Sequence, residues 1–243
     1  MSNYKIVIQY DGTQYCGWQI QNNDVSIQQK IQDAIKIILK EEVNLIGAGR
    51  TDAGAHALGQ VANFKTSKSF LLDKFLYSLN SILPPDISIK EIQLVDDNFH
   101  SRFDAKKRKY IYLISKNKSP FWERFSYRYH KSINIYLLNN YAEILKGEHN
   151  FFNLCKETPD VKHYNCFMYD MKFIEFNDLI VCKLIANRFI FGMIRTIIGT
   201  LLKAQQANQP IEFINNILEL KADNPYKQFI VPAKGLILYR VYY

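Results

Sequence analysis

The stretch GAGRTDAGAHALGQVANF, from Gly47 to Phe64, places a glycine-rich loop directly before an apolar strand. Four of the ten glycines of the chain fall within it. Glycine permits left-handed backbone angles and lets another group approach the backbone closely. Asp52, at the centre of the loop, therefore either caps a short turn or is a reactive carboxylate that a substrate approaches. The pattern alone leaves both interpretations open.

A catalytic role for this aspartate sets a condition on its neighbours. A nucleophilic carboxylate has to stay ionised inside a closed site. Burial raises the pKa of a carboxyl group, whereas a nearby cation lowers it. A nucleophilic Asp52 therefore needs an arginine close to it, and Arg50 and Arg195 are the candidates. Sequence spacing does not choose between them.

The hydrophobic pattern on either side of the loop predicts alternating strands and helices. We expect strands at 4–10, 43–48, 60–64, 87–95, 109–115, 167–176, 179–186 and 236–241. We expect helices at 27–39, 72–82, 135–145, 189–202 and 210–220, with Ser26 capping the first and Pro210 opening the last. Strict strand–helix–strand alternation is lacking, so we predict an α+β fold with helices packed on a largely antiparallel sheet.

The composition indicates an ordinary globular chain with a basic balance. Of 243 residues, 48% are hydrophobic and 22% are charged, which argues against disorder. The 31 basic and 23 acidic residues leave a net charge of +8. This charge favours a polyanionic partner without naming it. The apolar pattern breaks near residues 103–107, so we predict an N-terminal half at 1–104 and a C-terminal half at 105–243.

A basic run leads into a strand that carries two tyrosines. Five of the eight residues from Arg102 to Lys109 are basic, and Tyr110 and Tyr112 follow. The run is either a solvated loop before an ordinary strand or a phosphate-contacting patch beside aromatic faces on which an unstacked base could lie. We take Arg102, Lys106, Lys107, Arg108 and Tyr110 as candidate RNA-binding residues.

Known metal and nucleotide motifs are missing from the sequence. The cysteines at 16, 155, 166 and 182 form no C-x-x-C pair, and the histidines show no zinc-enzyme signature. Neither a P-loop nor a dinucleotide-binding glycine motif occurs. We therefore expect no zinc site and no nucleotide cofactor. Free thiols, the lack of a signal peptide and the lack of a long apolar run predict a cytoplasmic protein without membrane association.

Several motifs together resemble the tRNA pseudouridine synthase A family. The loop from Gly49 to Ala57 resembles the signature loop of that family, and Tyr10 to Gln19 resembles its opening motif. The stretches Phe99 to Phe103, Met193 to Arg195 and Ala233 to Leu236 follow in the same order. The resemblance covers nearly the whole chain, and the Arg-Thr-Asp-Ala-Gly loop is its most specific part.

The resemblance implies a fold, a reaction and a set of roles. The fold would have two α+β halves, an extended, mainly antiparallel sheet and a central basic cleft, in a homodimer that binds tRNA. The enzyme, an isomerase, would convert uridine to pseudouridine at positions 38–40 in the anticodon stem-loop, with no metal and no organic cofactor. By resemblance Asp52 is the nucleophile, Tyr110 packs against the target base and Arg195 pairs with the aspartate. Arg50 would lie near the flipped nucleotide.

The sequence also departs from the family pattern. An Arg-Thr pair is expected ahead of a strand between Phe152 and Tyr169, but His163-Tyr164-Asn165-Cys166 occupies that region. The departure affects how this loop holds RNA and which uridines are chosen. The alternative function is that of a non-catalytic tRNA-binding or RNA-folding paralogue. A zinc-dependent deaminase is disfavoured because the ligand spacing is missing.

Overall fold

The computed structural model describes residues 1–22, 24–159 and 161–243, and the chain divides into two compact units. The first unit comprises residues 1–106 together with 237–243, and the second comprises 107–236. The two α+β halves predicted from the sequence, 1–104 and 105–243, stay a prediction.

The first unit is built on a sheet whose central strands are antiparallel. β1 (Ser2–Tyr10) pairs antiparallel with both β3 (His56–Thr66) and β4 (Ile87–Val95). The short β2 (Ile46–Gly47) pairs antiparallel with β3. The last strand, β10 (Leu236–Tyr242), pairs with β3 in parallel. The register sets Tyr10 opposite Ala57, so the loop after β1 and the loop before β3 leave the sheet side by side.

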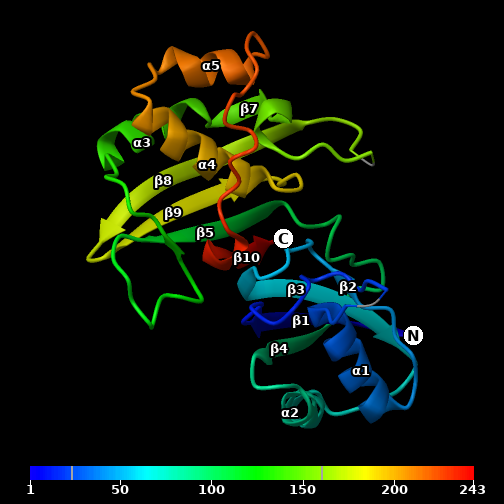
Figure 1. Ribbon diagram of the computed structural model, residues 1–243. Helices are drawn as coiled ribbons and strands as arrows, with labels where there is room; N and C mark the ends of the chain where they lie inside the picture. The colour runs from blue at the N-terminus through cyan, green and yellow to red at the C-terminus, as the bar shows by residue number, and fades with distance from the viewer. Residues whose placement is uncertain (23, 160) are drawn as a thin grey trace. The chain divides into compact units, whose positions relative to one another are not determined.

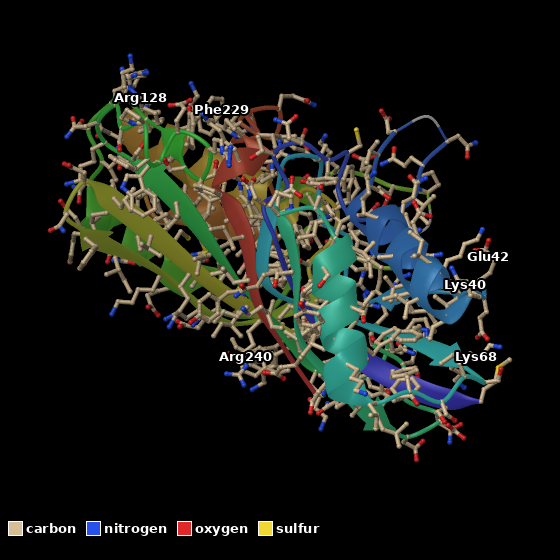
Figure 2. All side chains as sticks on the ribbon, turned by 90° about the horizontal axis from the view of Figure 1, so that it is seen from below. Lys40, Glu42, Lys68, Arg128, Phe229 and Arg240 are labelled. Atoms are coloured by element: carbon tan, nitrogen blue, oxygen red, sulfur yellow. The ribbon has the colours of Figure 1, made fainter. Side chains whose placement is uncertain are left out.

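Two amphipathic helices pack in the first unit. In α1 (Ile27–Leu39) the apolar residues recur at helical spacing, and Ile27, Ile31 and Ile35 are fully buried. Ser26 caps this helix, since its side chain accepts a hydrogen bond from the backbone N–H of Gln29. α2 (Leu72–Ile82) lies beside α1 and packs on β4 (Figure 1). Lys40 and Glu42, which follow the end of α1, are labelled in Figure 2.

The second unit has a run of four antiparallel strands. Its strand order is β5 (Lys107–Ser115), β9 (Leu179–Ala186), β8 (Asn165–Phe176) and β7 (Gly147–Asn150). These neighbours all pair antiparallel, and the short β6 (Tyr127–Arg128) adds to β5 in parallel. One face of the sheet is buried, and it carries Tyr112, Phe173 and Cys182.

Helices cover the buried face of these strands. α3 (Ile135–Ile144) packs on β8, and α4 (Met193–Gln206) lies beside α3 (Figure 1). α4 is buried over much of its circumference. The segment at Phe229, labelled in Figure 2, packs on it, and the Lys203 Nζ lies 4.4 Å from the ring centroid of Phe229. α5 (Glu212–Leu218) and the short 3-10 turns η1 (Phe152–Leu154) and η2 (Ala233–Gly235) complete the unit.

Three predicted elements differ from the structure. The strand expected at 43–48 is reduced to β2, although Val43 and Leu45 are buried. α4 begins at Met193, because Gly192 adopts a left-handed conformation with φ of 71° and ends the loop that carries Phe189. Pro210 precedes α5 by two residues, and its carbonyl accepts the N–H of Phe213.

The predicted class is otherwise confirmed: the fold is α+β, and its strand pairing is mainly antiparallel. All four cysteines are free, and three of them are buried. Over the described residues no helix is both long and apolar enough to cross a bilayer. The same residues include no group of three or more His, Cys, Asp or Glu side chains placed to hold a metal ion.

Candidate active site

Asp52 lies on the loop between β2 and β3 in the first unit and is half-buried. The loop turns sharply there, since the N–H of Ala55 donates to the carbonyl of Asp52 at 3.1 Å and Gly54 has a φ of +76°. The side-chain amide of Gln60 donates to the Gly49 carbonyl at 2.8 Å. These contacts fix both ends of the aspartate loop to the start of β3.

The opening motif, residues 11–19, braces this loop from the other side. The backbone N–H of Trp18 donates to the Thr51 carbonyl at 3.2 Å, and the N–H of Gly54 donates to the Tyr15 carbonyl at 3.2 Å. These two bonds flank Asp52. The buried hydroxyls of Tyr10 and Thr51 are 2.7 Å apart. The aspartate backbone is therefore held between two hydrogen-bonded neighbours, which limits its movement.

Glycines make this close contact of the two loops possible. A Cβ at Gly17 would lie 2.4 Å from the Thr51 carbonyl oxygen, and one at Gly12 would lie 1.9 Å from the Ala55 carbonyl oxygen. Neither approach leaves room for a side chain. Gly17 also has a φ of +87°, a conformation that favours glycine.

His56 ties β3 to the opening motif. It is 3% exposed, and its Nδ1 lies 3.1 Å from the backbone nitrogen of Gly12 and 3.1 Å from the Asp11 Oδ1. The two contacts compete, because Nδ1 either accepts the Gly12 N–H or carries a proton toward the carboxylate. In both cases the ring ties the start of β3 to the opening motif.

A second brace acts through Tyr15. Its hydroxyl donates to the Asp86 Oδ1 at 2.6 Å, and the Asp86 carbonyl accepts the N–H of Asp11 at 2.9 Å. Burial, with a smaller contribution from the Asp86 carboxylate, raises the pKa of Tyr15 well above its ordinary value. The phenol thus stays a hydrogen-bond donor at physiological pH. It anchors the loop in which the Tyr15 carbonyl accepts the N–H of Gly54.

The remaining predicted residues of the first unit are exposed cations. The Arg50 Nε donates to the Gln19 Oε1 at 3.3 Å, so Arg50 leans toward the opening motif. The Arg102 guanidinium lies 5.8 Å from the ring centroid of Phe103. Lys106 follows in the same segment, and its N–H donates to the Tyr242 carbonyl of β10 at 2.8 Å. All three side chains are accessible to a polyanion.

In the second unit, Tyr110 lies buried in the middle of a sheet. It pairs with Leu184 across β5 and β9, and it is 6% exposed. Phe189 meets its ring edge-on, with centroids 5.1 Å apart at 82°. This arrangement fixes the ring plane of Tyr110, as a residue that packs against a base requires.

Arg195 projects from the first turn of α4 and is half-buried. Its Nε donates to the Val231 carbonyl at 2.7 Å, and the Val231 N–H returns to the Arg195 carbonyl at 3.4 Å. Burial raises the pKa of the neighbouring Tyr112 well above its ordinary value, and the Arg195 charge partly offsets that rise. Backbone contacts thus orient the guanidinium along a defined direction.

The basic run continues from the first unit into β5. Lys107 places its Nζ 4.2 Å from the ring centroid of Tyr169, which is 41% exposed. The Arg108 Nη1 donates to the Asn187 carbonyl at 2.8 Å. The interpretation of this run as an RNA-binding surface is therefore supported by an exposed aromatic neighbour, Tyr169, which the sequence did not single out.

Sequence reasoning missed the residues that brace the predicted ones. Tyr15, Gln19 and Asp86 hold the aspartate loop and its arginine, and Phe189 and Asn187 hold Tyr110 and Arg108. Asp86 directly follows the Pro84-Pro85 pair, a rigid turn that signals a fixed backbone at this position. The contacts of the others depend on strand pairing, which spacing does not reveal.

The site features define a class of protein. The carboxylate on the doubly braced loop of the first unit and the exposed cations of each unit fit a protein that acts on a polyanion such as nucleic acid. Comparison with known proteins makes the class specific. A family model described as tRNA pseudouridine synthase matches residues 6–104 and 141–243.

Individual relatives agree over the full length. The tRNA pseudouridine synthase A of Brachyspira hyodysenteriae is 39% identical over 248 residues, covering 100% of this chain and 99% of that protein. The protein of the same name from Thermoanaerobacter pseudethanolicus is 38% identical and is covered completely. A chain in the crystal structure of a Cbf5–Nop10–Gar1 complex aligns with a TM-score of 0.36 and 11% identity, covering 94% of this chain and 70% of that one. The chain belongs to the tRNA pseudouridine synthase family.

Proposed function

We propose that this chain isomerises uridine to pseudouridine in tRNA, in the anticodon stem-loop at positions 38–40, with Asp52 as the nucleophile. Family membership supports the isomerase class. The assignment of the nucleophile to Asp52 rests on the hydrogen bonds from Trp18 and Tyr15 that brace the backbone around it. Glycines in the opening motif allow the two loops to approach closely enough for these bonds. A structural capping aspartate needs no such support.

The reaction needs only groups that the chain itself supplies. The Asp52 carboxylate forms a temporary bond to the nucleoside, and the bond between C1′ and N1 breaks. The freed uracil turns and C5 bonds to C1′, while the bond to Asp52 breaks and returns the free carboxylate. N1 gains a proton and C5 loses one, so there is no net oxidation or reduction. The target nucleotide has to leave its stack first, which costs a few kcal/mol. Stacking against an aromatic ring returns about 1–3 kcal/mol of that.

The other candidate residues receive roles within this proposal. Tyr110 packs against the extruded base and assists removal of the C5 proton. Arg195 pairs with the Asp52 carboxylate, and Arg50 lies near the flipped nucleotide. Arg102, Lys106, Lys107 and Arg108 contact phosphates of the tRNA. A homodimer in the cytoplasm completes the proposal, and sedimentation equilibrium of the purified protein tests the dimer.

The test of the activity uses the purified chain and an unmodified tRNA transcript that has uridines at positions 38–40. Mapping of pseudouridine after incubation is expected to show product at one or more of these positions, without added metal or nucleotide. A transcript in which these uridines are replaced by cytidine is the matched control and should gain none. Tight binding of the first transcript with no product would contradict the proposal and support the non-catalytic tRNA-binding alternative.

A further inference from the structure

A basic and aromatic patch lies in the second unit, where the loop before β8 meets the loop before α4. We call it the Arg188 patch, and it consists of Lys156, His163, Arg188 and Phe191. Two hydrogen-bonding contacts join its loops. The Arg188 Nη2 donates to the His163 carbonyl at 3.3 Å, and its Nη1 lies 3.4 Å from the His163 Nε2.

The second cation of the patch, Lys156, likewise contacts a backbone carbonyl and an aromatic ring instead of a carboxylate. The N–H of Lys156 donates to the Phe191 carbonyl at 2.9 Å, and the Lys156 Nζ lies 5.2 Å from the ring centroid of Phe191. Phe191 is 52% exposed, so one face of its ring stays open to solvent. Lys156 is itself exposed.

The charge of the patch is not neutralised within the part of the chain that the structure describes. There, neither Arg188 nor Lys156 has a carboxylate within ion-pair distance. Lys227, by contrast, does have a carboxylate partner, since its Nζ lies 3.2 Å from the Glu157 Oε1, and it lies 4.3 Å from the ring centroid of Phe152. Two cations that have no ion-pair partner among the described residues, beside an exposed ring, suit an anion next to a flat surface.

The position of the patch connects it with the departure found in the sequence. The family resemblance leads us to expect an arginine just ahead of this strand, but His163, Tyr164 and Asn165 occupy the region. The structure brings a guanidinium back to the same place from a different segment, because Arg188 lies against His163. Arg188 is thus placed to contact RNA where an arginine in the loop itself would contact it.

We infer that Arg188 and Lys156 contact backbone phosphates of the tRNA, so that the Arg188 patch is an RNA-binding surface that replaces the missing loop arginine. This inference rests on the proposed function for the identity of the polyanion. An acidic protein surface would suit the charge, but it gives no use to the open ring of Phe191 between the cations. A purely structural Arg188, which only ties two loops together, is the competing interpretation.

The experiment measures binding of the unmodified tRNA transcript at several salt concentrations by wild type, Arg188→Ala, Arg188→Lys and Lys172→Ala. Lys172 is an exposed lysine in the middle of β8, outside the patch, and its removal changes the charge by the same amount. Arg188→Ala should weaken binding about tenfold, as loss of a charged hydrogen bond does. Its slope of log affinity against log salt should shrink by about 0.7 to 0.9. Arg188→Lys should keep the wild-type slope, and so should Lys172→Ala.

Two results would overturn the inference. One is an Arg188→Ala protein with the wild-type affinity and slope. The other is weaker binding with an unchanged slope, which is the signature of a structural role. Thermal unfolding of each variant shows whether the fold persists. If Arg188→Ala unfolds, Lys156→Ala carries the test, because Lys156 is exposed and its removal should also shrink the slope by about 0.7 to 0.9, whereas an unchanged slope would overturn the inference. Pseudouridine formation by the wild type is measured with the same transcript, so that failure of the proposed function is seen separately from failure of the patch.

Discussion

At the scale of single residues, the aspartate loop depends on contacts that exclude a side chain. Gly17 combines a φ of +87° with an approach that would leave a Cβ only 2.4 Å from the Thr51 carbonyl oxygen. Gly54, on the other side of Asp52, has a φ of +76°, but no atom lies within 4 Å of the position its Cβ would occupy. A side chain at Gly54 would therefore meet backbone strain alone, whereas one at Gly17 would meet both backbone strain and a steric clash.

A pair of substitutions tests this distinction. Gly54→Ala should lower the free energy of unfolding by about 1 kcal/mol, since only the strained backbone angle opposes it. Gly17→Ala should lower it by about 2–4 kcal/mol, because the backbone of the opening motif also has to move away from Thr51. Urea unfolding measures both values. Equal losses in the two variants would show that the contact with Thr51 does not constrain the loop.

Sequence patterns identified the aspartate loop and the opening motif, but not the contacts between them. The glycine cluster singled out Asp52 as a candidate, and the opening motif was recognised as a separate stretch. That the two loops brace each other follows from the pairing of Tyr10 with Ala57, which brings the end of β1 beside the start of β3. Strand pairing joins distant parts of the chain, and a local pattern carries no information about it.

At the scale of elements, periodicity predicted the helices well and their ends less well. The spacing of Ile27, Ile31 and Ile35 gave α1 within its observed bounds, because an amphipathic helix displays its period along its whole length. The start of α4 was missed, since Phe189 and Ile190 continue the apolar pattern outside the helix. The left-handed Gly192 decides that boundary, and hydrophobicity does not record backbone angles.

The cap of α1 provides a test at this scale. Ser26→Ala removes the acceptor for the N–H of Gln29, which lies 3.2 Å from the Ser26 Oγ, and should lower the free energy of unfolding by about 1 kcal/mol. Ser81→Ala in α2 is the matched control. Ser81 bonds back to the Tyr77 carbonyl inside the helix, so alanine there should be neutral or slightly stabilising. Comparable losses in both variants would contradict the capping role.

At the scale of the whole molecule, the buried thiols link stability to pH. Burial raises the pKa of Cys155 from an ordinary 9.0 to about 12 and that of Cys166 to about 11. The folded chain therefore holds these protons more tightly than the unfolded chain. Their contribution to stability is complete below pH 9 and is lost as the pH rises through 11 and then 12.

Unfolding in urea at pH 8, 9 and 10 tests this linkage. The wild-type free energy of unfolding should fall above pH 9, with each thiol contributing up to about 1.4 kcal/mol per pH unit. Cys155→Ala should show a shallower fall, whatever its stability at pH 8, because one of the linked protons is absent. Parallel curves for the two proteins would mean that Cys155 does not titrate differently on folding.

The sequence also predicted the class of the molecule as a whole. The mixture of strand and helix patterns gave an α+β fold, and the net charge of +8 favoured a polyanion. The return of β10 to pair with β3 in parallel was not visible, because nothing in residues 236–242 identifies a partner strand so far back in the chain. The residue patterns singled out Asp52, Tyr110 and Arg195 as candidates, but their roles came from the resemblance to a family, and their joint action stays a prediction.

The central claim is that the Asp52 carboxylate carries out the isomerisation. Asp52→Asn keeps the size and the hydrogen-bonding backbone of the loop but removes the charge and the nucleophile. Pseudouridine in the unmodified tRNA transcript is measured after single-turnover incubation, with tRNA affinity and thermal unfolding measured alongside. We predict no detectable product, with affinity within about threefold of wild type, since phosphate contacts dominate binding. Product formation by Asp52→Asn at the wild-type rate would contradict the claim.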